Sequence, residues 1–530
     1  MALSGVLALL ALPMTGCRTP ADFQQSADAE AYGVISELRR QFVEDSAAFS
    51  IDLPNPLSFR EGVEGPADIS ECLHVAARQS TDYQVRKEQL YLVALDLTFE
   101  RFLFDVQTNG TLGASMFRGP FGSETGQFDG GASLSRLLGT GALIVADIGV
   151  RLFRDLSSGD GFDAVTDLGL SITQPLLRGS GKRIVKENLT QAERDVVYEV
   201  RSYERFRRTF AVQVAQRVYR ILQQAAIVAN ERVNIDNLRV LRERNEELAN
   251  AGRLSDIQVD QARQDELRSD NRLIVEQQRY ETQLDELRLF LGVPTEESFE
   301  PDPEELAQLS TLADMAFPLD EELLAELALS QRLDYLTILD RVDDAERKVV
   351  VAADALRAGL DLELDANLSS AEGRPLDFDM DDITGSLSLE LDLPINRLAE
   401  RNAYRAALIR LQAAQRDARD LAYDIRAQLR AALREAIATR ETNAIQRGAV
   451  VLAERRVEST ALRMAAGRAA TRDILEAQED LLEAKNAAVR SRIDHHLALL
   501  ALWRDIELLR VDASGIAFEE SLLDLGDVQP

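Results

Sequence analysis

The chain of 530 residues contains little cysteine, histidine, proline, glycine and tryptophan. Its two cysteines, Cys17 and Cys72, are too few for a disulfide framework. Its three histidines include only one close pair, His495 and His496, and adjacent residues cannot share a helix face, so no metal site is indicated. The shortage of proline, glycine and tryptophan, together with abundant Ala, Leu, Glu and Arg, is typical of long helices.

Basic side chains and long apolar runs are also scarce. The chain has 60 Lys and Arg against 90 Asp and Glu, and its formal charge of -30 disfavours nucleic acid as a partner. No segment approaches the roughly 18 to 20 apolar residues that a transmembrane helix needs, which excludes a helical membrane protein. The stretch "RGSGKR" lacks the spacing and the Ser or Thr of a phosphate-binding loop. We therefore expect no enzymatic activity, cofactor or metal.

The first 17 residues, "MALSGVLALLALPMTGC", have the apolar core and small-residue end of a signal peptide. The stretch "MTGC" resembles a bacterial lipobox, in which the cysteine is lipidated and becomes the mature N-terminus. We therefore expect a lipoprotein-type signal peptide over residues 1–17, with lipidation at Cys17. A plain secretory signal is the alternative.

Two segments alternate strictly between apolar and polar residues, "LDLELDANL" over 360–368 and "SLSLELDL" over 386–393. This pattern predicts strands with the length of a tilted membrane-spanning strand, although a soluble sandwich is equally compatible. Weaker alternation near 106–116 and 166–173 predicts two more strands. Four strands cannot close a barrel, so three copies sharing about twelve are expected. Segment 142–152 also alternates, and it could be further strands or a surface hairpin.

Two very long helical patterns cover about 183–248 and 398–464. About 66 residues at 1.5 Å each would extend about 100 Å, and the heptad-like apolar spacing needs partner helices along that length. Each pattern breaks at a glycine, Gly252 or Gly467, before another helix begins.

The order helix, strands, long helix, glycine break, helix occurs twice, which indicates an internal duplication. "NAGRLSDIQVDQA" and "AAGRAATRDILEAQ" align Gly252 with Gly467, and Pro175 corresponds to Pro394. The N-terminal extension (18–66), which contains scattered prolines, is expected to wrap the outside of the protein or to stay flexible. The predicted divisions after the signal peptide are an N-terminal extension (18–66), a first repeat with a turn near 252 (67–294), a linker (295–318), a second repeat with a turn near 467 (319–510) and a tail (511–530).

The duplicated plan, the "QPLLRGSGKR" joint and the two "AG-R" breaks resemble the TolC-like outer membrane efflux protein family. The resemblance implies a mainly α fold with membrane β-structure: a homotrimer with a long α-helical barrel and a shared twelve-stranded β-barrel. Such a protein is the outer-membrane exit duct of a tripartite efflux or type I secretion system. It passes small molecules, metals or polypeptides outward and is not an enzyme.

The resemblance also implies the location and the partners. The duct would lie in outer-membrane lipid with a long periplasmic part, and it would dock onto a periplasmic adaptor protein and an inner-membrane transporter of RND or ABC type. The competing interpretation is a periplasmic coiled-coil scaffold or adaptor without a membrane barrel.

Three groups of site residues follow. Pro175 would end the strand ladder, Gly179 and Gly181 would permit a bend into the helix, and Pro394 repeats this joint without the glycines. By resemblance, Asp473 and Glu476 form an acidic ring that closes the pore; ordinary solvated helix residues are the alternative. By resemblance too, the two glycine turns contact the adaptor through Ala251, Gly252, Arg253, Leu254, Ala466, Gly467, Arg468 and Ala469.

Overall fold

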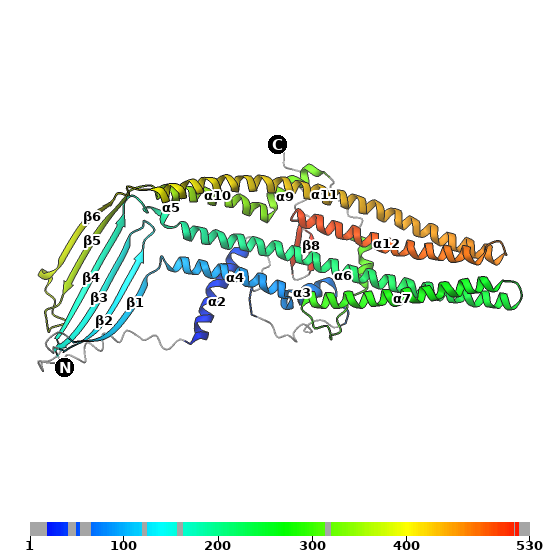
Figure 1. Cartoon of the computed structure of the whole chain (residues 1–530), viewed down its shortest axis with the longest axis horizontal. Coiled ribbons are helices and arrows are strands. Elements are labelled where there is room, and N and C mark those ends of the chain that lie inside the picture. Colours follow the sequence, from blue (N-terminus) through cyan, green and yellow to red (C-terminus); the bar gives the residue numbers. More distant parts are fainter. Residues whose placement is uncertain are drawn as a thin grey trace. The chain divides into compact units, whose positions relative to one another are not determined.

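The computed structural model describes residues 19–40, 49–52, 65–118, 124–155, 163–312, 320–512 and 515–518. Cys17 and the predicted signal peptide lie outside these ranges. The chain divides into two compact units (Figure 1). The first, here the sheet unit, contains Met1–Phe49, Gln89–Val200 and Thr337–Ala418. The second, here the helical unit, contains Ser50–Glu88, Arg201–Leu336 and Arg419–Pro530. Each unit therefore draws on both predicted repeats.

The two predicted long helices are present as α6 (Glu187–Asn250, 64 residues) and α11 (Leu398–Ala465, 68 residues). Neither contains proline, and α6 has no glycine, so nothing in either sequence interrupts the hydrogen bonding between successive turns. After the glycine turns the chain continues as α7 (Asp256–Leu291) and α12 (Thr471–Asp505). Helices α4 (Thr81–Phe102), α6, α10 (Leu333–Asp354) and α11 each contribute residues to both units.

The predicted N-terminal extension contains a regular helix, α2 (Pro20–Arg39). Thr19 and Asp22 cap its first turn reciprocally, and Pro20 occupies a first-turn position whose amide needs no partner. The remaining helices are α3 (Ile69–Gln79), α5 (Lys182–Val185), α8 (Glu304–Leu312) and α9 (Glu321–Gln331). A short hairpin of β7 (Leu509–Asp512) and β8 (Gly515–Phe518) reaches into the predicted tail.

The described part of the sheet unit contains one antiparallel sheet of six strands in chain order, which Figure 1 labels from β1 to β6. The strands are β1 (Gln107–Arg118), β2 (Glu124–Leu137), β3 (Leu143–Asp155), β4 (Asp163–Pro175), β5 (Gly359–Ser369) and β6 (Thr384–Asp392).

The described sheet has six strands per chain, two more than the four expected. The number of strands in a trimeric barrel stays a prediction. The alternating segment 142–152 falls in β3, and the residues before it form β2; both strands lie inside the sheet between β1 and β4. The pattern was hard to read because Gly126 and Gly130 stand at apolar-face positions of β2, and glycine weakens the hydrophobic alternation.

Packing between the helices buries the apolar side chains of the helical unit. Leu238 and Leu241 of α6 lie in one cluster with Ile474 and Leu475 of α12, and Val457 of α11 packs against that cluster. Within the described ranges, no helix is both long enough and apolar enough to cross a membrane.

Candidate functional site

The six-stranded sheet has one apolar and one polar face. Because side chains alternate along a strand, the register assigns each residue to a face. Ala132 and Leu134 of β2 stand opposite Ile148 and Ala146 of β3, and the apolar positions of β4, β5 and β6 continue the same face. Many of these side chains are exposed, with Leu112 at 79%, Met116 at 75% and Leu387 at 71%. A surface of this kind needs an apolar environment to cover it.

The opposite face is polar and strongly acidic. Arg151 pairs with Asp129 at 3.7 Å, while serine hydroxyls donate to Glu363 and Asp365 from the neighbouring strand, each at 3.3 Å. These contacts leave a surplus of carboxylates, which favours water and cations along this face. The acidic side chains include Asp129, Asp147, Asp163, Asp167, Asp361, Glu363, Asp365, Glu390 and Asp392.

The first strand-to-helix joint follows β4. Pairing continues past Pro175, because the amide of Leu176 donates to Leu360 at 2.7 Å and that of Arg178 donates to Ala358 at 3.2 Å. Pro175 therefore lacks only its own amide donor. The expectation that it would end the ladder is wrong. The bend comes at Gly179 and Gly181, whose φ angles of +77° and +89° are left-handed.

Side chains anchor this joint. The amide of Gly179 donates to Asp354 of α10 at 2.7 Å, and Arg178 binds Asp392 at the end of β6 at 2.7 Å. The second joint contains Pro394 and no glycine, and the side chain of Asn396 accepts the amide of Leu398, the first residue of α11, at 3.2 Å. The glycine-rich joint is thus the one with left-handed residues.

The two glycine turns of the helical unit have the same backbone geometry. Gly252 and Gly467 have φ angles of +71° and +70°. The amide of Arg253 donates to Leu248, and that of Arg468 donates to Arg463, both at 2.8 Å. This is the hydrogen bond that closes a helix with a left-handed glycine, so the predicted alignment of the two turns matches their geometry.

The two predicted gate residues, Asp473 and Glu476, are exposed on one face of α12. The carboxylate of Asp473 accepts the amide of Ala470 at 2.9 Å, so it caps the helix, and its location also suits the helix dipole. Glu476 binds Arg456 of α11 at 3.0 Å. The same guanidinium contacts Asp480, one turn further along.

The sequence analysis did not identify Arg456 as a partner of the acidic residues. The spacing of the two residues from the glycine turn could have indicated this contact. Arg456 lies 11 residues before Gly467 and Glu476 lies 9 after it, so a helical hairpin places them at nearly the same height.

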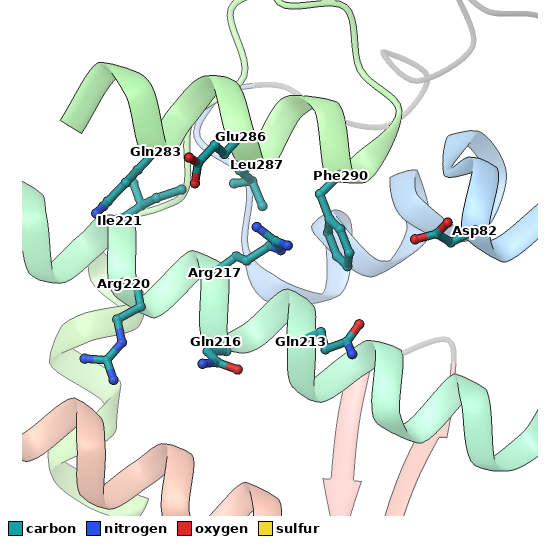
Figure 2. A pocket seen from close by; sticks show the side chains of 10 residues that line it. All are labelled: Asp82, Gln213, Gln216, Arg217, Arg220, Ile221, Gln283, Glu286, Leu287 and Phe290. Atoms are coloured by element: carbon teal, nitrogen blue, oxygen red, sulfur yellow. The ribbon is translucent and has the colours of Figure 1, made fainter. Parts of the chain in front are cut away.

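The helical unit also has a polar hollow of about 650 Å³ beside α4, α6 and α7 (Figure 2). Arg217 lies over the ring of Phe290, 4.2 Å from its centre, and that ring stacks on Phe210. Two acidic side chains, Asp82 and Glu286, and two basic ones, Arg217 and Arg220, line the hollow, so its charge favours no single ligand class.

No group of three or more His, Cys, Asp or Glu in the described ranges is placed to hold a metal ion. Burial, followed by the charges of Asp68 and Glu71, raises the pKa of the Cys72 thiol far above its usual range. This thiol therefore stays protonated and unreactive.

Neither a family model nor a curated protein sequence matches the chain. Solved structures do. The outer membrane protein VceC of Vibrio cholerae is 15% identical, with a TM-score of 0.58 over 83% of this chain and 95% of that chain. CusC, studied for transmembrane channel formation, is 12% identical, with a TM-score of 0.61 over 86% and 98%. The CmeC outer membrane channel of Campylobacter jejuni is 13% identical, with a TM-score of 0.59 over 90% and 91%.

This chain has the fold of these outer membrane channels. The sequence resemblance to the TolC-like family is confirmed at the level of fold, and the proteins with that fold named above are channels rather than enzymes. The duplication, the gate and the adaptor contacts remain predictions.

Proposed function

We propose that this protein is the outer-membrane exit duct of a tripartite efflux or type I secretion system. One observation carries the proposal: the six-stranded sheet presents an exposed apolar face and an acidic face, on a chain with an outer membrane channel fold. The apolar face would contact outer-membrane lipid. The acidic face would line the water through which small molecules, metals or polypeptides leave.

The open edges of the sheet support assembly of several copies, and the resemblance sets their number at three. Among the described strands, β1 and β6 each pair on one side only. Unsatisfied backbone groups in lipid cost several kcal/mol each, so the edges need partners. Copies of the same chain supply them when β6 of one copy pairs with β1 of the next, and a barrel closes. The long helices of three copies would form the periplasmic part.

The partners are assigned by the resemblance. A periplasmic adaptor would contact the turns at Gly252 and Gly467, and an RND or ABC transporter in the inner membrane would supply the cargo. Lipidation at Cys17 would add an anchor in the same membrane.

Membrane fractionation tests the proposal. The wild-type protein is expected in outer membranes, extracted only by detergent, as a trimer that heat dissociates. Leu389→Arg places a charge on the apolar face and should reduce membrane assembly, because Arg or Lys at mid-membrane costs about 2–4 kcal/mol. The neighbouring Ser388→Arg, on the polar face, is the matched control and should assemble. A soluble periplasmic monomer would instead support a scaffold or adaptor.

Cross-linking tests the adaptor contact. Arg253→Glu combined with Arg468→Glu should reduce cross-linking to the adaptor without reducing trimer yield. Arg374→Glu, an exposed arginine outside the two turns, is the control. Equal cross-linking in all three proteins would argue against contact through the turns.

A further inference from the structure

We propose that the β2–β3 hairpin is part of the membrane wall, so that three copies close a barrel of eighteen strands instead of twelve. This inference rests on the proposed function. It concerns the number of strands and the width of the lumen, which that function leaves open.

The pairing places the hairpin inside the sheet. Strand β2 pairs with β1 along its length, from Gln107 opposite Ser135 to Arg118 opposite Glu124. Strand β3 pairs with β4 from Leu143 opposite Thr173 to Phe153 opposite Asp163. A hairpin projecting from the surface would lose these ladders, and β1 and β4 would then have to pair directly.

The side chains continue the two faces across the hairpin. Phe128 and Leu134 of β2 and Ile148 of β3 lie on the apolar face, and they are 51%, 50% and 36% exposed. Asp129, Ser133 and Asp147 lie on the polar face. A hairpin surrounded by water would gain nothing from an exposed apolar side, whereas a strand in the wall needs one.

The hairpin strands are long enough to cross the membrane. They contain 14 and 13 residues, against the roughly 9 to 11 that a tilted membrane strand requires. Their neighbours β1 and β4 have 12 and 13 residues, so the four strands of this part of the sheet match in length.

The wider barrel follows from strand spacing. With strands about 4.8 Å apart and tilted by about 40°, twelve strands give a barrel roughly 24 Å across, and eighteen give roughly 36 Å between backbones. The larger value lies in the range of the 16- to 18-stranded porins, which hold a water-filled channel. The acidic side chains of the hairpin would then line open water.

Cysteine labelling in outer membranes tests the placement. Ser133→Cys and Leu134→Cys report the two faces of β2, and Ser171→Cys and Leu170→Cys report those of β4. A water-soluble maleimide needs an ionised thiol in water, so lumen positions should react several-fold faster than lipid positions. The wild-type protein provides the blank, because Cys72 is buried and protonated.

The control pair on β4 distinguishes failure of the eighteen-strand inference from failure of the proposed function. Faster labelling at both Ser133→Cys and Ser171→Cys than at their neighbours supports the inference. Alternation on β4 with equal labelling of both β2 positions places the hairpin in water and overturns the inference, while the duct remains. No alternation on β4 overturns the proposed function and the inference together.

Electron cryomicroscopy of the protein in lipid nanodiscs measures the strand number directly. Eighteen strands in the wall are expected. Removal of residues 124–155, which deletes both strands and their turn, should leave twelve. A wild-type wall of twelve strands would overturn the inference.

Discussion

Arg456 of α11 binds Glu476 of α12, with Nη2 lying 3.0 Å from Oε1. Both side chains are about half exposed, at 48% and 54%. Exposed pairs of this kind contribute about 0–1 kcal/mol to stability, so this contact matters more for the charge near the Gly467 turn than for folding.

The pair predicts opposite effects of neighbouring substitutions on ion flow. Arg456→Gln leaves Glu476 and Asp480 without their cation, so block by multivalent cations should strengthen. Asp473→Asn with Glu476→Gln removes two charges per copy, so block should weaken and single-channel conductance should change. Recording in planar bilayers measures both.

Glu454→Gln is the control for this experiment, because Glu454 is as exposed as Glu476, lies two residues from Arg456 and pairs with Lys485 of α12 instead of with that arginine. It should behave as wild type. Identical conductance and block in all variants would refute an acidic ring at the turn.

The acidic sheet face predicts a preference for cations. Glu363→Gln with Asp365→Asn keeps oxygen acceptors for Ser388 and Ser386 but removes two charges, so the reversal potential under a salt gradient should become less cation-selective. The difference should shrink in 1 M salt, where the Debye length is about 3 Å. An unchanged reversal potential at low salt would exclude this face from the ion path.

Glu507 predicts a large stability effect in the helical unit. Its buried carboxylate lies 2.5 Å from Arg205 and 2.6 Å from Arg208. Glu507→Gln removes the anion that two partly buried guanidiniums share, although Arg205 keeps Asp334 at 3.4 Å. Breaking a buried pair costs about 3–5 kcal/mol. Thermal or denaturant unfolding of the detergent-solubilised protein measures this cost.

Glu321→Gln is the matched control, because Arg430 and Glu321 form a pair at 2.6 Å in which both side chains are about half exposed. It should cost about 0–1 kcal/mol. Equal costs for the two variants would show that burial does not distinguish the pairs.

His496 predicts a loss of stability in acid. Burial, followed by the charge of His495, lowers the pKa of His496 to about 4. Below about pH 6.5 the histidine is protonated in the unfolded chain but stays neutral in the folded chain. The contribution of His496 to the free energy of unfolding is therefore complete above about pH 6.5 and declines toward about pH 4. The full change is roughly 3 kcal/mol, at about 1.4 kcal/mol per pH unit.

His496→Phe keeps a ring against Tyr219, whose ring centre is 5.0 Å away, and removes the titration. The melting temperature of the variant should therefore fall less steeply than that of the wild type between pH 6.5 and 4. Parallel curves would mean that His496 binds its proton equally well in the folded and the unfolded chain, so that burial does not lower its pKa.

The strands were predictable where every second residue is apolar. The segments 360–368 and 386–393 became β5 and β6 within two residues at each end, because alternation directly encodes which face is wet. Strand β2 has the same geometry, but Gly126 and Gly130 occupy its apolar side and weaken the alternation. Pairing with β1 and β3 holds it in the sheet, although its side-chain pattern does not predict a strand.

In the turns and the helices too, local features were predictable from the sequence, whereas contacts between helices were not. A left-handed glycine was readable at Gly252 and Gly467 because few other residues adopt that φ. The reciprocal cap of Thr19 and Asp22 was also a readable start signal for α2. Contacts across a turn, such as Arg456 with Glu476, depend on how two helices rotate against each other, and a single sequence does not state that rotation.

The order of the strands limits how such a wall can change in evolution. The chain makes four strands between α4 and α5 and two between α10 and α11. Neighbouring antiparallel strands reverse direction, so only an even number returns the chain to the sheet margin from which it departed. A single added strand would leave the next helix at the opposite margin of the sheet. Insertion therefore proceeds by whole hairpins, and a threefold assembly can change its circumference only in steps of six strands.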